Sequence, residues 1–185
     1  KERASGEIIG IESRRELVDK SRELAARLGF ERMRFLACTV EDSLTSAELP
    51  ERVDVVTALH ACNTATDDAI RFALKHDAAA IALVPCCQAE AARLLDDVHG
   101  PSDALWRHPV QRRAFGAHIT NTIRALLLEA HGYKVRLTEF TGFEHTQKNE
   151  LILAERVQKS NAQARAQLER LLAAVPVRLG VLDQF

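Results

Sequence analysis

Residues 53–84, VDVVTALHACNTATDDAIRFALKHDAAAIALV, decide the fold of this chain. Two short apolar runs, Val53 to Leu59 and Ala78 to Val84, enclose a segment whose apolar residues recur at helical spacing. We expect a helix over Asp67 to His76, with a threonine before it as the cap. A strand, a helix and a second strand in this order are typical of a parallel sheet with crossover helices.

The same alternation continues on both sides of this stretch. Upstream, Glu7 to Glu12 and Met33 to Cys38 are apolar runs typical of buried strands. Between them lies a helical pattern that Ser13 would cap and Gly29 would end. Downstream, the sequence predicts two more helices, Gln88 to Val98 and Ile119 to His131, the second closed by Gly132.

After that last helix the pattern changes. Tyr133 to Phe140 and Glu150 to Arg156 are expected strands with no helix between them, which predicts an antiparallel pair. The fold class is therefore α/β, with a doubly wound, mostly parallel sheet that ends in an antiparallel strand pair. We expect the main domain over residues 1–157 and a C-terminal helix and tail over residues 158–185.

Composition and charge exclude several classes of protein. The 185 residues are 46% hydrophobic and 28% charged, which suits one ordinary globular α/β domain. With 25 basic and 26 acidic residues the net charge is −1, so a nucleic-acid partner would need a local basic patch. The sequence contains no apolar stretch of membrane-spanning length and no leader-like start, which favours a cytoplasmic location with reduced cysteines.

In doubly wound sheets, ligands bind beyond the carboxyl ends of the strands. Glu12 closes the first expected strand, and a carboxylate in this position can accept hydrogen bonds from both hydroxyls of a ribose. An exposed acid at the start of a helix would give the same sequence. From this position alone, the two interpretations stay open.

Five segments taken together carry a family resemblance. They are GIESRRELVDKSRELAARLGF (10–30), LACTVED (36–42), TALHACNTATDDAI (57–70), ALVPCCQ (82–88) and EFTGFEHTQKNELILAER (139–156). The chain resembles a bacterial family of class I S-adenosylmethionine-dependent methyltransferases, in which LHACDTATDDA, PCC and EHTPKN recur in this order. A more distant likeness, to eukaryotic tRNA 2′-O-methyltransferases, covers only His60 to Asp67. The resemblance implies a Rossmann-like fold and S-adenosylmethionine as cofactor.

One family feature has no counterpart here. Class I methyltransferases open with a first strand and a glycine-rich loop, whereas Lys1 to Gly6 looks like the end of the helix that would follow that loop. In the usual strand order, this strand lies at the centre of the sheet, next to the strand that ends at Leu59. We therefore expect the natural protein to carry the strand upstream of Lys1.

The resemblance also implies which residues contact the cofactor. Glu12 and Ser13 would hold the ribose, while Thr39, Val40 and Glu41 would border the adenine, although Val40 could equally be a packing residue. The remaining cofactor contacts would come from the end of the next strand, at Leu59, His60 and Ala61. No metal is implied.

Three residues are candidates for the chemistry. His60 could remove a proton from the nucleophile, since a histidine titrates near about pH 6.5, or it could only bond a neighbouring loop. Asn63 stands where the family has Asp, which disfavours residue 63 as a general base. Cys86, in Pro85-Cys86-Cys87, could act as a thiolate, could join a metal site with His60 and Cys62, or could be a buried reduced thiol.

The methyl acceptor is suggested only by one basic stretch. Residues 106–124 contain Arg107, Arg112 and Arg113 with Trp106 and Phe115, a combination that suits phosphate contacts and base stacking but is also found in ordinary surface loops. RNA is slightly favoured over a protein or a small molecule. A catalytically degenerate module that binds a partner is the alternative function. An NAD-dependent oxidoreductase would instead have helix-linked strands to its end.

Overall fold

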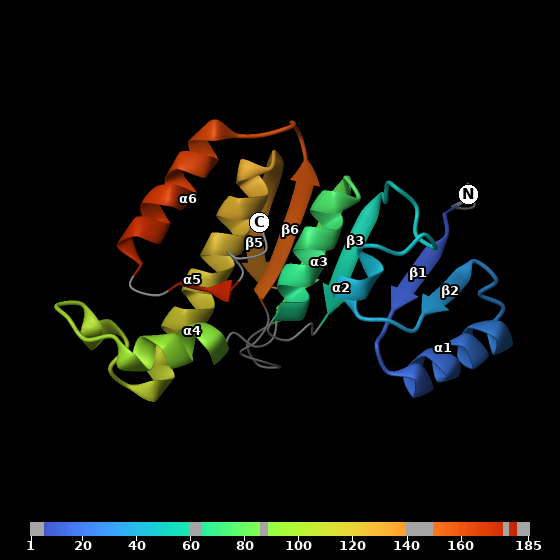
Figure 1. The fold of residues 1–185 in the computed structure, drawn as a ribbon, viewed down its shortest axis with the longest axis horizontal. Coiled ribbons are helices and arrows are strands. Elements are labelled where there is room, and N and C mark those ends of the chain that lie inside the picture. Colours follow the sequence, from blue (N-terminus) through green and yellow to red (C-terminus); the bar gives the residue numbers. More distant parts are fainter. Residues whose placement is uncertain (1–5, 60–63, 86–88, 140–149, 176–177, 181–185) are drawn as a thin grey trace. The chain divides into compact units, whose positions relative to one another are not determined.

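A computed structural model describes residues 6–59, 64–85, 89–139, 150–175 and 178–180 of the chain (Figure 1). The fold is mixed α/β, and the chain divides into two compact units, Lys1–Pro50 and Glu51–Phe185. The domain boundary after residue 157 stays a prediction. Among the described helices, none combines the length and apolarity needed to cross a bilayer.

The first unit is a strand–helix–strand unit with a short second helix. Its elements are β1 (Ile8–Ile11), α1 (Arg15–Arg27), β2 (Met33–Leu36) and α2 (Val40–Ser43). The two strands are parallel, and Gly10 lies opposite Phe35. A Cβ on Gly10 would lie 2.6 Å from the Phe35 ring, so this strand position needs a glycine. Buried Val18 and Ala25 form the inner face of α1.

The ends of α1 confirm one predicted signal and correct another. Gly29 follows the helix with a φ of +72°, a conformation that favours glycine, as the sequence predicted. Arg14, rather than Ser13, is the N-cap residue, and it makes no side-chain capping bond. The Ser13 hydroxyl is directed instead toward Glu12, at 3.5 Å.

The second unit contains a four-stranded sheet in the order β3-β4-β6-β5. Its described elements are β3 (Val55–Leu59), α3 (Thr64–Lys75), β4 (Ala80–Val84), α4 (Ala89–Leu94), two 3-10 turns (Leu95–Asp97 and Asp103–Leu105), α5 (Pro109–Ala130), β5 (Tyr133–Glu139), β6 (Glu150–Arg156) and α6 (Ala162–Ala174). The strands β3 and β4 are parallel, whereas β6 is antiparallel to both β4 and β5. The predicted antiparallel pair is confirmed, and β6 inserts between β4 and β5.

Helix α5 begins earlier than the sequence suggested. It starts at Pro109, ten residues before the expected start at Ile119, and Pro109 occupies the first helical turn. Proline suits this position because its fixed φ is helical and its missing N–H has no partner to lose. Part of the stretch that could have been a surface loop is therefore helical.

One hydrophobic core unites the sheet and helices of the second unit. Its fully buried members include Ile70, Ile81, Ile123 and Ile152. Leu168 of α6 also lies in this core, and α6 packs against α5 (Figure 1). The apolar tail has a partner that the sequence did not show, since the core includes Leu179, which is 1% exposed.

Tyr133→Phe is expected to lower the free energy of unfolding by about 1–3 kcal/mol, because it leaves buried hydrogen-bonding groups without their partner. The Tyr133 hydroxyl donates to the carbonyl of Ala78 at 2.7 Å and accepts from Arg156 Nη2 at 2.9 Å. Urea unfolding with an unchanged slope would measure the loss. Lys134→Ala, at an exposed neighbouring position, is the control, and equal stability of the two variants would contradict the prediction.

Candidate functional site

The carboxyl ends of β1 and β2 lie side by side in the first unit. The backbone N–H of Glu12 donates to the carbonyl of Leu36 at 3.1 Å, which extends the strand pairing by one residue. Glu12 therefore stands at the sheet edge, where α1 is about to begin. This is the edge at which a doubly wound fold binds its ligands.

The Glu12 carboxylate is held by Arg14. Oε1 accepts from the Arg14 backbone N–H at 2.9 Å and from Nε at 3.0 Å, while Oε2 accepts from Nη2 at 3.1 Å. Hydrogen bonds from the Arg14 side chain and backbone lower the pKa of Glu12 to about 2. The group is thus an ionised acceptor at neutral pH, with Oε2 the less crowded oxygen. Glu12 lies between the last residue of β1, Ile11, and the N-cap residue of α1, Arg14, a position that both interpretations of this acid allow.

The residues after β2 form a small capped turn. The Thr39 hydroxyl accepts from the Asp42 backbone N–H at 3.0 Å and donates to Asp42 Oδ2 at 2.7 Å. The first of these bonds caps the N-terminus of α2, and the two bonds together occupy the Thr39 hydroxyl. Val40 is half-buried and Glu41 is exposed. A ligand at this edge would meet the Val40 side chain rather than the Thr39 hydroxyl.

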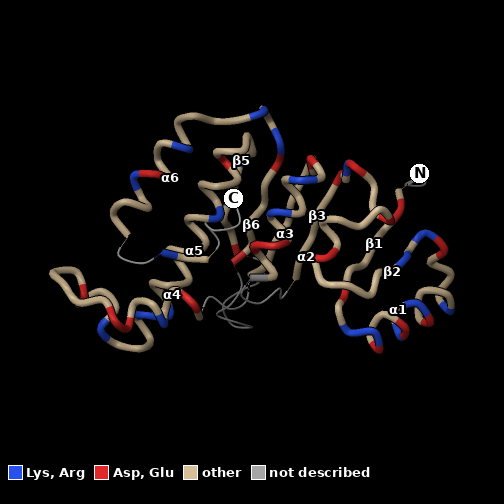
Figure 2. Tube along the Cα trace, in the orientation of Figure 1, with Lys and Arg blue, Asp and Glu red and all other residues tan. Residues whose placement is uncertain are grey.

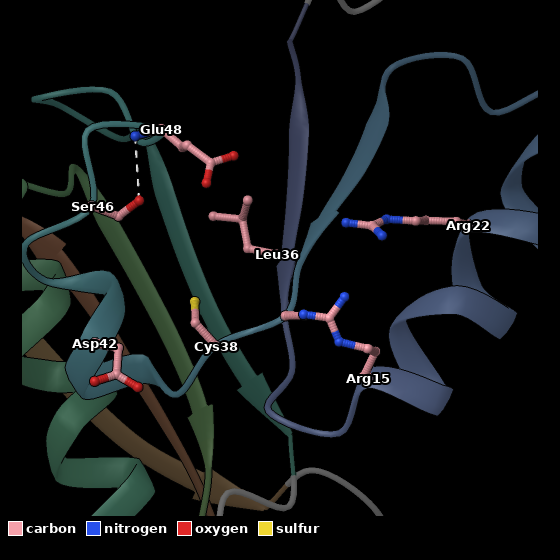
Figure 3. A pocket seen from close by; sticks show the side chains of 8 residues that line it. Arg15, Arg22, Leu36, Cys38, Asp42, Ser46 and Glu48 are labelled. Atoms are coloured by element: carbon pink, nitrogen blue, oxygen red, sulfur yellow. Dashed lines mark hydrogen bonds between the residues drawn. The ribbon is translucent and has the colours of Figure 1, made fainter.

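A pocket of about 310 Å³ opens in the same unit (Figure 3). Its lining residues are Arg15, Arg22, Leu36, Ala37, Cys38, Asp42, Ser46 and Glu48. Arg15 and Arg22 of α1 extend toward the end of β2, and Arg22 Nη2 donates to the Phe35 carbonyl at 2.7 Å. None of the five described cofactor candidates in this unit lines the pocket. The sequence signals for this pocket were the strand-end position of Cys38 and the seven-residue spacing of the two arginines.

The thiol in this pocket is not activated. Burial raises the pKa of Cys38, and the carboxylates of Asp42 and Glu48 raise it further. A thiol under these influences is protonated at neutral pH and is a poor nucleophile. The pocket therefore offers side chains of both charges, but its thiol is not an activated nucleophile.

In the second unit, β3 and β4 end together at Leu59 and Val84. Leu59, one of the predicted cofactor contacts, is 59% exposed at this edge. The other predicted residues of the reaction centre, which are His60, Ala61, Asn63 and Cys86, lie outside the described residues.

A buried ion pair joins the first turn of α3, the helix that follows β3, to α5. Asp67 Oδ1 accepts from Arg124 Nε at 2.6 Å, and the two side chains are only 5% and 2% exposed. Burial raises the pKa of Asp67, and the bond from Arg124 opposes this rise. The sequence left Asp67 as either a general base or an acid that favours the helix start, and it did not pair Asp67 with Arg124. The sequence signal that could have revealed this pair was a charged residue, Arg124, within the apolar run of α5.

The basic stretch is less open to a nucleic acid than its sequence suggested. Arg107 pairs with Asp103 at 3.5 Å and Arg112 with Asp96 at 2.5 Å, so both signs of charge occur in this region (Figure 2). Arg113 is exposed. Base stacking by Trp106 is wrong, because this side chain is 5% exposed, donates from Nε1 to the Val98 carbonyl and packs against Phe115.

No group of three or more His, Cys, Asp or Glu side chains within the described ranges is placed to hold a metal ion. Cys62 and His60, which the sequence offered as ligands, lie outside those ranges.

Comparison with known proteins gives one family and several structures. A family model described as a methyltransferase domain matches residues 1–93. An rRNA methylase from Streptococcus thermophilus is 11% identical with a TM-score of 0.51, over 82% of this chain and 74% of that chain. The 23S rRNA methyltransferase ErmE is 10% identical with a TM-score of 0.48, over 92% of this chain and 63% of that chain. The first of these structures shows a shared fold. No curated protein matches the sequence.

Proposed function

Because the chain belongs to the methyltransferase-domain family, we propose that it transfers the methyl group of S-adenosylmethionine to a nucleophile beyond the carboxyl end of β3. The observation that carries this proposal is the extent of the family match. Residues 1–93 include every predicted cofactor contact and all three catalytic candidates. The chain would be a class I enzyme located in the cytoplasm.

The described residues at the edge of the first unit fit a nucleoside. Glu12 presents an ionised carboxylate, and among the described residues its Oε2 accepts only from Arg14 Nη2, so it can also accept from a ribose hydroxyl. Ser13 lies beside it, and Val40 supplies an apolar side chain of the kind that borders an adenine. Glu41 is exposed and can accept from an exocyclic amine.

The chemistry would be shared between the cofactor and the segment after β3. S-adenosylmethionine supplies an electrophilic methyl group when it is bound. His60 would remove the acceptor's proton, and the Asn63 amide would orient the acceptor through its mixed donor and acceptor groups. Leu59 and Ala61 would contact the cofactor, and Cys86 would be the remaining candidate for the chemistry, as a thiolate. Positioning of the two reactants supplies most of the acceleration in such a transfer.

The outer edge of β3 supports a further strand of the class I sheet. Within the described residues β3 pairs only with β4, and Val55 and Leu59 are each 59% exposed. An unpaired edge with apolar side chains is a template for another strand. We propose that the glycine-rich first strand of the family pairs there.

The acceptor is proposed to be RNA, with Arg107, Arg112 and Arg113 as phosphate contacts. Exposed Arg113 supports this more than the other two, which are paired with acids. Methyl-tritiated S-adenosylmethionine, incubated with the full-length protein and RNA, protein or metabolite fractions, tests it. Label in the RNA fraction is the expected result. Label in another fraction would correct the acceptor, and label in none, with cofactor binding intact, would favour the degenerate module.

Glu12→Ala is expected to weaken cofactor binding by about 10- to 100-fold, since it removes hydrogen bonds to a charged acceptor that contribute about 1.5–3 kcal/mol. Arg14→Ala is the matched variant. It removes the competing guanidinium but keeps the backbone N–H that orients Glu12, so affinity should be retained or rise.

Calorimetric titration with S-adenosylhomocysteine between pH 5 and pH 8 measures both variants. Because Arg14 lowers the pKa of Glu12 to about 2, the carboxylate stays ionised over this range and its contribution should not change with pH. An unchanged affinity in Glu12→Ala would remove this residue from the cofactor site.

A further inference from the structure

The proposed chemistry does not explain one buried network of hydrogen-bonded polar side chains in the second unit. This network comprises Asp67, Arg124, Asn121 and Glu150. Arg124 and Asn121 are each 2% exposed and Asp67 is 4% exposed. Moving a charged side chain out of water costs several kcal/mol unless it is paired and hydrogen-bonded. The buried Arg124 side chain therefore requires specific hydrogen-bonding partners.

Those partners come from three different elements. Arg124, on α5, donates from Nε to Asp67 Oδ1 at 2.6 Å and from Nη1 to Asn121 Oδ1 at 3.2 Å. The Asn121 amide nitrogen in turn donates to Glu150 Oε2. The hydrogen-bonded network thus extends from the first turn of α3 to the first residue of β6.

Both ends of this network, Asp67 and Glu150, lie near the carboxyl edge of the sheet. Leu83 of β4 pairs with Ile152, and Glu139 at the end of β5 pairs with Glu150, so β6 begins at the edge where β4 and β5 end. Helix α3 begins five residues after β3 ends at the same edge. This is the edge at which the fold places ligands.

Stability alone does not explain such a pair. A buried ion pair replaced by apolar side chains of similar volume often leaves a protein equally stable or more stable. A guanidinium provides something an apolar group cannot, because its rigid fork fixes the directions of two acceptors at once. Here the two acceptors lead to the start of α3 and, through Asn121, to the start of β6.

We propose that Arg124 is a positioning residue for methyl transfer, which holds the starts of α3 and β6 in a fixed relation at the carboxyl edge of the sheet. This inference rests on the proposed function, since the segment before α3 contains His60. Arg124 does not touch the reactants. It acts through Asp67 and Asn121, which fix the backbone at the starts of α3 and β6.

Two variants separate positioning from stability. Arg124→Lys keeps the positive charge but cannot hold both acceptors in fixed directions. The double variant Asp67→Leu with Arg124→Met removes both charges and fills the space with apolar groups, so it should fold even if the single variant does not. Arg170→Lys, at an exposed position on α6, is the matched control.

For both variants we expect kcat to fall by about tenfold or more, while KM for S-adenosylmethionine stays within about twofold, because small misplacements at a reaction centre cost rate rather than binding. Rates are measured per folded molecule, well below the unfolding temperature. A wild-type kcat in both variants would overturn the proposal, since a merely stabilising pair would alter only the unfolding temperature.

Hydrogen exchange tests the same inference without turnover. In Arg124→Lys, amides of residues 64–68 and 150–152 should exchange about tenfold faster, with the rest of the second unit unchanged. Unchanged protection of both segments would overturn the proposal even if activity is lost. If the wild-type protein transfers no methyl group, the proposed function fails, while exchange still decides whether Arg124 positions these two segments.

Discussion

Gly132→Ala is expected to lower the free energy of unfolding of the second unit by about 3–5 kcal/mol, as the sum of backbone strain and overpacking. Gly132 ends α5 with a φ of +87°, a conformation that L side chains rarely adopt. A Cβ there would lie 2.1 Å from the carbonyl oxygen of Gln158. The chain after β6 cannot move away easily, because the N–H groups of Val157 and Gln158 both donate to the Gly132 carbonyl.

Urea unfolding followed by circular dichroism measures this loss against Gly100→Ala. A Cβ at Gly100 would meet no atom within 4 Å, so this control should keep the wild-type midpoint. Since a domain is typically stable by only about 5–15 kcal/mol, Gly132→Ala should be partly unfolded at 37 °C. If the urea midpoint of Gly132→Ala equals that of the control, Gly132 does not lie as close to Gln158 as the structure places it.

His60→Ala is expected to reduce kcat by about 10²- to 10⁴-fold, the range that a positioned general base supplies. Affinity for S-adenosylmethionine should change little, because the proposed role of His60 is removal of the acceptor's proton. A plot of log kcat against pH for the wild-type protein should rise through the pKa of an essential base, and His60→Ala should lose this rise.

His99→Ala, at an exposed histidine, is the matched control and should retain the wild-type kcat and pH profile. If His60→Ala turns over at the rate of this control, His60 has no part in the mechanism. If cofactor affinity falls together with kcat, the residue contacts the cofactor instead.

Local signals predicted most of the elements, because each acts within a few residues. Glycines at 29 and 132 ended helices where the sequence placed their ends, and the strand runs matched the observed strands within three residues at each end. The position of β6 between β4 and β5 was not predicted, because strand order depends on pairing between distant residues. Similarly, helical periodicity missed the start of α5, where Pro109 was the better signal.

The candidate site was predictable only where its residues are close in sequence. The position of Glu12 at a strand end follows from a short pattern, and the Thr39 cap of α2 also joins residues only three positions apart. Arg124 did not, because its partner Asp67 is 57 positions away and the sequence places Arg124 at the end of a basic, exposed-looking stretch. Which arginine of such a stretch is buried depends on the packing of α5 against α3 and β6, which no local pattern records.

Binding of S-adenosylhomocysteine to the full-length protein tests the proposed cofactor most directly. Isothermal titration calorimetry should show a single saturable site that weakens in Glu12→Ala and is retained in Arg14→Ala. Absence of binding by the wild-type protein at high micromolar ligand would contradict a methyltransferase that uses this cofactor.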